Sequence, residues 1–368
     1  MQSVQRAVGS GLTFYEDIDE MGIRENTMDH MNAYERVMGV LNGKRPDYPP
    51  VVLMAREWCS KQAGFDLTDE LDSVERHVYA QTYAVDKFGY DCVWDMFACH
   101  SESEAMGSVL KISRGHPPSV EIPAVQNYDT DLSHLKLFDP YQNQRLSLIL
   151  EGMRRLKNRF KHEVPVIGYI QAPFRHVSML RGSENAMRDL YKAPESLRKL
   201  CEIALSSLIV YAVAIISTGV DILFISDPSS SGDAISKKHW EEWGKPLTSR
   251  LVNLIKPTGI KTIMHVCGDN SDRLDSFAET GVNCLSLDEG VDFEAARKLL
   301  GPRYCLMGNV STSLLAMGSP EEVKEATREV IDKAGQDGGL LVSGGCIIPA
   351  ICPPENIQAM VETAKTRG

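Results

Sequence analysis

Short apolar runs alternate with longer amphipathic segments along most of the chain. The runs are rich in Val, Ile and Leu and are apolar on both alternating faces, which is typical of parallel strands buried under helices. The apolar runs are Val51–Met54, Cys92–Trp94, Val164–Ile170, Val220–Ile225, Ile260–Val266, Val282–Leu287, Tyr304–Met307 and Gly339–Val342. This alternation predicts the α/β class, and eight runs favour a (β/α)8 TIM barrel. Periodicity alone also fits an open doubly wound sheet, and region 110–160 contains no clear strand.

Helix signals fall between the apolar runs. Pro194 opens a long segment that ends near Gly219, because proline is well placed at a first helical position. Ser319, followed by Pro-Glu-Glu, predicts a capping box for a helix that ends at Gly335. Two further helices are predicted, over Asp292–Leu300 and Pro354–Arg367.

The chain shows no linker that would separate two compact domains. We expect residues 1–47 to form an N-terminal helical extension, with Asn32–Leu41 as its most helix-like part, and residues 48–368 to form a single barrel domain. The longest apolar stretch, Ile203–Ile216, is too short to span a bilayer and predicts a buried helix. The first residues lack the apolar core of a signal peptide.

Composition narrows the class of protein further. Of 368 residues, 43% are apolar and 24% are charged, an ordinary globular balance. The 39 basic residues are outnumbered by 50 acidic ones, which argues against a nucleic-acid-binding surface. Nine cysteines are scattered along a chain without an export signal. We therefore expect a cytoplasmic protein with reduced thiols that binds neither nucleic acid nor a membrane.

The first candidate for chemistry is a histidine and a cysteine at the end of the fifth run. His265 and Cys267 are two residues apart and therefore project from the same face of a strand. They stand at its carboxyl end, where barrel enzymes build their sites. An imidazole and a thiolate together suit zinc. Taken alone, the pair is equally consistent with a core histidine beside a buried cysteine.

A second cysteine strengthens the zinc hypothesis. Cys346 follows Ser-Gly-Gly at the end of the eighth run, and the glycines allow the backbone to turn tightly near a ligand. The fifth and eighth strands of a barrel open on the same face. His265, Cys267 and Cys346 would leave one tetrahedral position open, as in a catalytic zinc site.

Three nearby residues compete for a place in the same site. Asp288 or Glu289, just after the sixth run, could supply a fourth ligand that leaves when substrate arrives. Either carboxylate could instead cap a helix or face solvent. Cys352 is another candidate ligand, but its position between Ile351 and two prolines favours a packing role.

Two other aspartates follow predicted strands and are candidate catalytic residues. Asp95 and Asp227 would point into the barrel mouth and could hold a polar substrate or a proton. Apolar surroundings would raise the pKa of the Asp95 carboxyl. Either aspartate could instead cap the helix that follows. The remaining thiols in apolar surroundings are predicted to be core residues: Cys92, Cys99, Cys201, Cys284 and Cys305.

Several motifs together resemble a known family. They are Glu35–Val37, Leu41–Pro49, His265–Gly268, Leu306–Val310 and Gly345–Cys346 with Pro354–Ile357. Their order and spacing resemble the uroporphyrinogen decarboxylase superfamily over about residues 30–366, and most closely its corrinoid-dependent methyltransferases, the methylcobamide:coenzyme M methyltransferases. The resemblance implies a (β/α)8 barrel.

The resemblance also implies a reaction. A zinc ion held by His265, Cys267 and Cys346, with Asp288 as a further ligand, would keep an acceptor thiol deprotonated for attack on the methyl group of a methylated corrinoid. The acceptor would be a thiol such as coenzyme M, or tetrahydrofolate. The resemblance implies a corrinoid carrier protein as partner and a homodimer as the expected assembly. We assign Arg56 and Asn309 to cofactor binding.

Two alternatives remain open at the level of sequence. A metal-free uroporphyrinogen decarboxylase would use Asp95, which falls where that branch keeps its catalytic aspartate, and Arg56, which falls in its arginine-rich stretch. Glu57 carries the wrong sign for a polyanionic substrate. The second alternative is a non-catalytic corrinoid or tetrapyrrole binder with a structural zinc.

Overall fold

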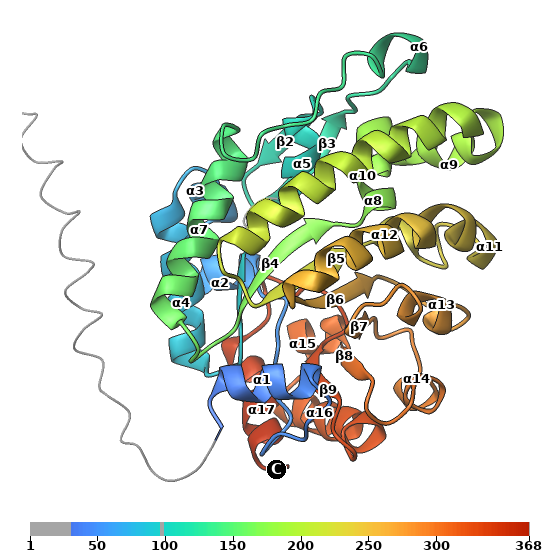
Figure 1. Cartoon of the computed structure of the whole chain (residues 1–368). Helices are drawn as coiled ribbons and strands as arrows, with labels where there is room; N and C mark the ends of the chain where they lie inside the picture. The colour runs from blue at the N-terminus through green and yellow to red at the C-terminus, as the bar shows by residue number, and fades with distance from the viewer. Residues whose placement is uncertain (1–30, 96–98, 368) are drawn as a thin grey trace, which may run out of the picture. The chain divides into compact units, whose positions relative to one another are not determined.

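A curled parallel sheet forms the centre of the fold in the computed structural model, which describes residues 31–95 and 99–367 (Figure 1). Seven strands are hydrogen-bonded in the order β1-β4-β5-β6-β7-β8-β9, and all six pairings are parallel. Their bounds are β1 Val93–Asp95, β4 Val166–Gln171, β5 Ile222–Ser226, β6 Lys261–Val266, β7 Cys284–Leu287, β8 Cys305–Val310 and β9 Leu340–Gly344.

The segment before β1 closes the sheet into a barrel. Val51 forms a parallel bridge with Val342 of β9, and the Val52 amide donates to the Val342 carbonyl at 2.8 Å. On its other side, the Asp91 amide donates to the Val51 carbonyl at 2.7 Å. This segment therefore occupies the place of an eighth strand between β9 and β1, and the predicted (β/α)8 barrel is confirmed. The open doubly wound alternative is wrong.

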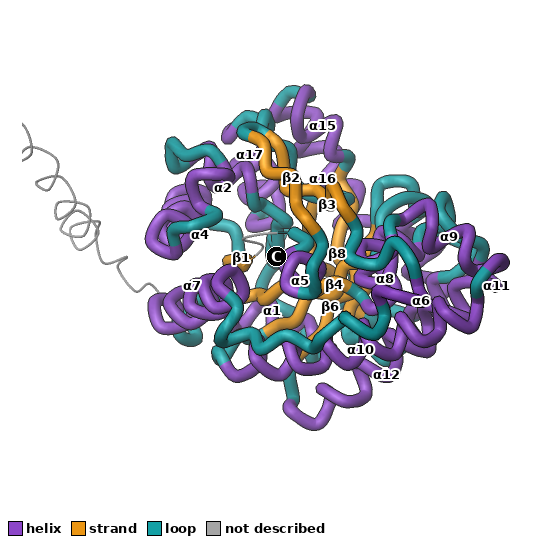
Figure 2. Tube along the Cα trace, turned by 90° about the horizontal axis from the view of Figure 1, so that it is seen from above, coloured by secondary structure: helices purple, strands orange, loops and turns teal. Residues whose placement is uncertain are grey.

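Helices follow the strands and cover the outside of the barrel (Figures 1 and 2). The predicted segments correspond to α10 Pro194–Ser217, α14 Phe293–Leu300, α16 Pro320–Ala334 and α17 Pro354–Lys365, and Ser319 caps α16 in the predicted box with Glu322. The others are α1 Ala33–Leu41, α2 Glu57–Gln62, α3 Leu67–Glu70, α4 Val74–Phe88, α5 Ser101–Ala105, α6 Tyr128–Asp131, α7 Gln144–Phe160, α8 Pro173–Arg181, α9 Ser183–Lys192, α11 Lys237–His239, α12 Lys245–Ile255, α13 Leu274–Ala278 and α15 Thr312–Met317. Short 3₁₀ or π turns are η1 Pro228–Ser230, η2 Trp240–Gly244 and η3 Lys256–Thr258.

The most apolar helix is a core element, as its sequence predicted. The helix is longer than the predicted apolar stretch Ile203–Ile216, and by length and composition alone α10 could cross a membrane. It packs against β4, α8 and α12, and 56% of its most apolar window is buried within the fold. Its apolar character is therefore explained by contact with the barrel.

A two-stranded hairpin lies outside the barrel sheet, in the region where no strand was predicted. Strands β2 Val109–Ser113 and β3 His116–Ile122 pair antiparallel, and Figure 2 shows them side by side. Most of their side chains are exposed or half-buried. A strand with little buried surface carries no continuous apolar run, so the pattern used to find strands missed this hairpin.

The described part of the N-terminal extension packs against the end of the barrel where strands begin. Helix α1 starts after Asn32, whose side chain and that of Glu35 form a reciprocal cap. The buried Arg36 donates to Asp47 at 2.7 Å and to Asp91, just before β1, at 2.8 Å. Residues 1–30 of the predicted extension lie outside the described residues. The opposite end of the barrel holds the candidate site.

Candidate metal centre at the barrel mouth

Three metal-binding side chains converge at the carboxyl ends of β6 and β9. His265 Nε2 lies 3.2 Å from Cys267 Sγ and 3.6 Å from Cys346 Sγ. The two sulfur atoms are 3.8 Å apart, and both cysteines are free thiols. His265 is buried and the cysteines are half-buried, so the cluster is shielded yet reachable from the mouth.

The spacing of these three atoms matches a tetrahedral zinc site. Zinc binds sulfur at about 2.3 Å and nitrogen at about 2.0–2.1 Å, which places neighbouring tetrahedral ligands about 3.5–3.8 Å apart. The observed separations of 3.2, 3.6 and 3.8 Å fall in or close to that range. One nitrogen and two sulfurs are a zinc-binding donor set, so the residues present fit the ion that the sequence suggests.

A neighbouring strand orients the His265 ring. Its Nδ1 lies 3.3 Å from the Ser286 carbonyl oxygen and 3.1 Å from the Ser286 hydroxyl, both on β7. A proton on Nδ1 is donated there, which leaves the Nε2 lone pair directed at the two sulfurs. The ring also stacks on Phe224 of β5, with centroids 6.0 Å apart. These contacts hold the imidazole in a ligating orientation.

The two thiols are in hydrogen-bonding contact, which shifts their pKa values in opposite directions. The hydrogen bond from Cys267, followed by contact with His265, lowers the pKa of Cys346 to about 4 despite burial. The same contact and burial raise the pKa of Cys267. One sulfur of the pair is therefore a thiolate at neutral pH, and the thiolate is the form that binds metals.

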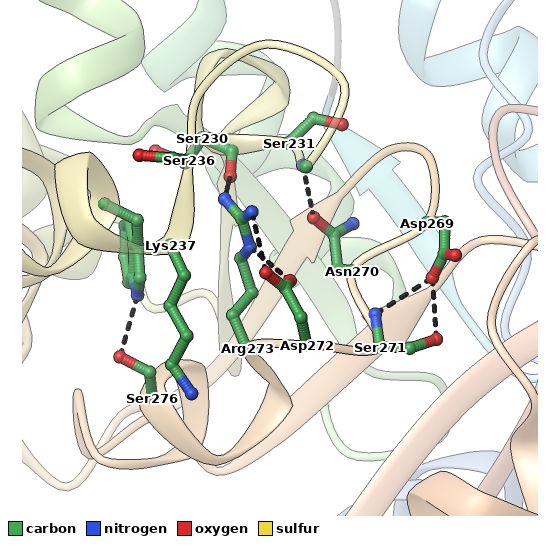
Figure 3. Close-up of polar contacts among 12 residues, drawn as sticks. Ser230, Ser231, Ser236, Lys237, Asp269, Asn270, Ser271, Asp272, Arg273 and Ser276 are labelled. Carbon is green, nitrogen blue, oxygen red and sulfur yellow. Dashed lines mark hydrogen bonds and ion pairs between the residues drawn. The ribbon is translucent and has the colours of Figure 1, made fainter.

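The side chain of Asn270, which is labelled in Figure 3, holds the loop that carries Cys267. Its Nδ2 lies 3.1, 3.0 and 2.9 Å from the carbonyl oxygens of Val266, Cys267 and Gly268. Its Oδ1 accepts from the Gly232 amide, in the loop after β5, at 3.0 Å. Asn270 is buried, so one amide group ties two mouth loops together and fixes the position of Cys267.

Figure 3 also shows a second tie between the same two loops. The Arg273 guanidinium donates to the Ser230 carbonyl oxygen at 3.3 Å and is paired with Asp272 at 2.7 Å. Asp269 accepts from the Ser271 amide at 2.9 Å and so closes the turn between them. The loops after β5 and β6 thus form one connected frame beside the cluster.

Two glycines permit the close contacts around the cysteines. Gly268 has φ +79°, and a Cβ there would lie 2.2 Å from Asp233 Oδ2. A Cβ on Gly345 would lie 2.6 Å from the Glu289 amide nitrogen. The glycine before Cys346 is therefore needed for close approach to the loop after β7, rather than for a left-handed backbone.

The loop after β7 lies beside the cluster and is hydrogen-bonded to the loop that carries Cys267. Asp288 Oδ2 accepts from the Gly268 amide at 2.9 Å, and its charge contributes to the raised pKa of Cys267. Glu289 accepts from the Thr312 amide at 2.6 Å. Asn309, expected to bind cofactor, donates to the Asp288 carbonyl at 3.1 Å and the Val291 carbonyl at 2.9 Å. Among the described residues, the compact donor group contains only His265 and the two cysteines.

The other cysteines lie outside this group. Cys352 is buried, and its carbonyl accepts from the Trp58 indole at 2.9 Å, so it has a packing role. Cys99 differs from its expected place in the core, because it is half-buried and its sulfur lies 2.5 Å from Arg56 Nη1. An apolar sequence neighbourhood did not reveal the distant arginine.

Asp95 lies away from the barrel interior. Its Oδ2 is 3.7 Å from His77 Nε2 of α4, and a Cβ on Gly152 of α7 would meet it at 2.9 Å. The preceding residue, Trp94, instead contacts Phe224 inside the barrel, with ring centroids 4.6 Å apart. Because successive strand residues point to opposite faces, Asp95 faces the helices. The expectation that it points into the mouth is wrong.

Asp227 is fully buried at the end of β5, beside the cluster. Its amide donates to the His265 carbonyl at 2.8 Å, and its Oδ2 accepts from the Ser230 hydroxyl at 2.6 Å. Its Oδ1 has no hydrogen-bond partner within the described ranges. Burial raises the pKa of Asp227 to about 6, although Ser230 and Arg175 oppose the rise. The carboxyl thus braces its loop through one oxygen and leaves the other available.

A family model described as uroporphyrinogen decarboxylase (URO-D) matches residues 32–367. The chain belongs to this family. The family predicted from the sequence motifs is therefore confirmed.

The proteins that are similar to this URO-D member include both methyltransferases and uroporphyrinogen decarboxylases, the two branches expected from its motifs. A methylcobamide:CoM methyltransferase of Methanosarcina acetivorans is 30% identical over 279 residues, covering 75% of this chain and 80% of that protein. A uroporphyrinogen decarboxylase of Chlorobaculum parvum is 27% identical over 276 residues, covering 72% and 76%. A solved structure described as a methyltransferase from Methanosarcina mazei superposes with a TM-score of 0.84 at 23% identity, over 92% of this chain and 99% of that one, and shares its fold.

Two arginines of this URO-D member complete the mouth. Arg56, predicted from sequence, is buried and pairs with Glu57, while its Nε has no partner in the described part of the chain. Arg175, in the first turn of α8, was missed. It is half-buried, and its one side-chain hydrogen bond to a described residue is a 3.5 Å contact with the Ser229 hydroxyl. A signal was present, since Arg175 follows a predicted strand by a few residues, at the end where barrel sites form.

Proposed function

We propose that this protein is a zinc-dependent methyltransferase that moves a methyl group from a methylated corrinoid to a thiol such as coenzyme M, or to tetrahydrofolate. The observation that carries the proposal is the convergence of His265, Cys267 and Cys346, whose ligand atoms all lie within 4.8 Å of one another. The similarity to a methylcobamide:CoM methyltransferase supports the same class of reaction.

The three clustered residues would hold the zinc ion. When bound, zinc supplies a Lewis acid that keeps an acceptor thiol deprotonated at neutral pH. Ser286 fixes the ligating face of His265, and Asn270 fixes the loop that bears Cys267. Asp288 accepts a hydrogen bond from Gly268 in that loop. We propose Asp288 as the carboxylate that completes the ligand set before the acceptor binds.

Asp227 is the candidate group for proton handling. Its Oδ1 has no partner among the described residues, and its pKa of about 6 lets it accept or return a proton near neutral pH. We assign it the proton released by the methyl acceptor. Asn309 would act by holding the loop that contains Asp288. We assign Arg56 to the border of the bound cofactor or acceptor.

The methyl donor in this proposal is a corrinoid held by a separate carrier protein. The cluster lies at the open end of the barrel, so a carrier would dock over that end to bring its corrinoid to the site. A homodimer is the expected assembly from the family resemblance.

The metal-free decarboxylase alternative has less support. Arg56 is already paired with Glu57, which reduces its charge available to a polyanionic substrate. Asp95 faces α4 and α7. The 27% identity to a uroporphyrinogen decarboxylase is accounted for by common family membership.

The test is the loss of the cobalt–carbon absorbance of methylcobalamin when coenzyme M, other thiols or tetrahydrofolate is supplied in turn. We expect turnover by the zinc-loaded protein with at least one acceptor, and none by Cys267→Ala. Cys352→Ala is the matched control, because that cysteine is buried outside the cluster. Zinc binding without turnover for any acceptor would favour the non-catalytic binder, and uroporphyrinogen decarboxylation without metal would favour the decarboxylase.

A further inference from the structure

We propose that Arg175 binds an anionic group, a sulfonate or a carboxylate, on the methyl acceptor. This inference rests on the proposed function, since it assigns the second end of a substrate whose reactive atom lies at the metal centre. It makes Arg175 a specificity-determining residue, and the acceptor a small molecule with a methyl-accepting atom and a negative charge.

The first observation is that Arg175 forms no ion pair with any residue that the structure describes. Its neighbour on the same helix, Arg181, pairs with Asp189 at 2.7 Å, and the buried Arg36 pairs with Asp47 at 2.7 Å. No carboxylate in the described ranges pairs with Arg175, and its contact with Ser229 at 3.5 Å is long. A half-buried guanidinium loses hydration without gaining a partner, so an anion bound there would supply the missing interaction.

The second observation is that the nearby carboxylates, Glu102 and Asp227, form hydrogen bonds with residues other than Arg175. Both carboxylate oxygens of Glu102 accept hydrogen bonds from Gln171 at 2.9 Å, one from its backbone N–H and one from its side-chain Nε2. Asp227 uses one oxygen for Ser230. Arg175 acts on both carboxyls only through space, lowering the pKa of each against the larger effect of burial. Its donors therefore remain available to a ligand.

The third observation concerns the sign of the local potential. Helix α8 begins with Pro173 and has no side-chain cap, so its positive end adds to the Arg175 charge. His100 lies within the influence of both Arg175 and Arg56, and burial followed by these two charges lowers its pKa to about 4. His100 is thus neutral, and its Nδ1 has no partner in the part of the chain that the structure describes. Arg175, Arg56 and His100 therefore form a wall of the mouth that carries positive charge. This wall also presents the His100 Nδ1 atom to a ligand.

The position of Arg175 relates this wall to the metal centre. Arg175 follows β4, Asp227 follows β5 and His265 ends β6, and these strands are successive neighbours in the sheet. An acceptor held by its anion at Arg175 would therefore extend across the end of β5 toward the cysteines.

Binding is tested first without chemistry. Ethanesulfonate, which has no thiol, and the uncharged ethanesulfonamide are titrated calorimetrically into the zinc-loaded wild-type, Arg175→Gln and Arg175→Lys proteins. Arg188→Gln is the matched control, because Arg188 is exposed on α9. We expect Arg175→Gln to weaken ethanesulfonate binding about 10- to 100-fold and Arg175→Lys to restore part of the affinity. The affinity for ethanesulfonamide should be the same in all three proteins.

Kinetics with charged and uncharged acceptors provide the second readout. Arg175→Gln should raise the KM for 2-mercaptoethanesulfonate by the same factor and leave kcat/KM for 2-mercaptoethanol unchanged. If tetrahydrofolate is the acceptor, the increase in KM should appear there instead, which would identify a carboxylate as the anion.

Three results would overturn the inference: no ethanesulfonate binding by wild type at millimolar concentration, equal binding by Arg175→Gln, or equal losses with charged and uncharged acceptors. The last indicates a structural role. Failure of the proposed function is distinct, because it would appear as no methyl transfer by wild type to any acceptor, while the calorimetric comparison still decides whether Arg175 binds an anion.

Discussion

The sulfur atoms of Cys267 and Cys346 lie 3.8 Å apart, although 79 residues separate them in the chain. Barrel closure explains this proximity, because both cysteines follow strands whose carboxyl ends open on one face. The glycine before Cys346 then lets its loop approach the loop after β7. The site is thus produced by topology together with two permissive backbone positions.

Metal content is the first prediction. The protein purified without added metal should contain about one zinc per chain, and His265→Ala, Cys267→Ala and Cys346→Ala should each contain less than about a tenth of that. Each substitution removes one of three protein ligands. Measurement is by inductively coupled plasma mass spectrometry. Cys352→Ala should retain zinc, and its loss there would contradict the assigned ligand set.

Gly268 should be needed for the metal centre beyond its backbone conformation. Gly268 and Gly259 have φ +79° and +81°, but a Cβ meets Asp233 only at Gly268, while Gly259 has open space. Alanine at either position should cost about 1–2 kcal/mol of stability through the left-handed backbone. Gly268→Ala alone should also lower zinc affinity at least tenfold. Equal zinc affinities in the two variants, from competition with a chelator, would refute the steric argument.

The two aspartates after strands should respond differently to substitution. Asp227→Asn should lower kcat/KM for methyl transfer by about 10²–10⁴-fold with zinc retained, because the variant cannot take up a proton. Asp95→Asn should change kcat/KM by less than about threefold and lower the unfolding free energy by about 1–3 kcal/mol, since it removes a buried polar contact to His77. Steady-state kinetics and urea unfolding test the pair. A large loss of kcat/KM in Asp95→Asn together with a small loss in Asp227→Asn would instead support Asp95 as the catalytic residue.

The buried contacts of His77 predict a pH-dependent stability. Burial alone lowers the pKa of His77, but Asp95 and Glu70 outweigh burial and raise it above its ordinary value. A raised folded-state pKa stabilises the fold fully below the unfolded pKa of about 6.5, and this contribution is lost as pH rises through the folded pKa. The difference in unfolding free energy between wild type and His77→Gln should therefore be larger at pH 6 than at pH 9. His134→Gln, at an exposed histidine, should show no such trend.

The barrel and the convergence of His265 with Cys346 were predictable for the same reason. Strands buried on both faces carry continuous apolar runs, and residues at their carboxyl ends meet in space, so His265 and Cys346 could be paired before any coordinates. The hairpin β2–β3 could not be found this way because it is largely exposed. The direction of the Asp95 side chain was predicted wrongly, because the face to which a residue at a strand end points depends on the register of that strand.

Electrostatic partners across the chain were the least predictable feature. The half-buried Cys99 is near Arg56, 43 residues away in sequence, and nothing in its apolar neighbours indicates that contact. That Arg175 has no carboxylate partner in the described ranges likewise depends on where Glu102 and Asp227 direct their oxygens. Such relationships depend on loop conformations, which periodicity does not describe.

The central claim is that His265, Cys267 and Cys346 hold one zinc ion with a position open to the acceptor. X-ray absorption at the zinc edge tests it most directly, before and after addition of 2-mercaptoethanesulfonate. We expect two sulfur ligands at about 2.3 Å in the resting protein and three after addition. A zinc ion with no sulfur ligands, or with a sulfur count that no thiol acceptor changes, would contradict it.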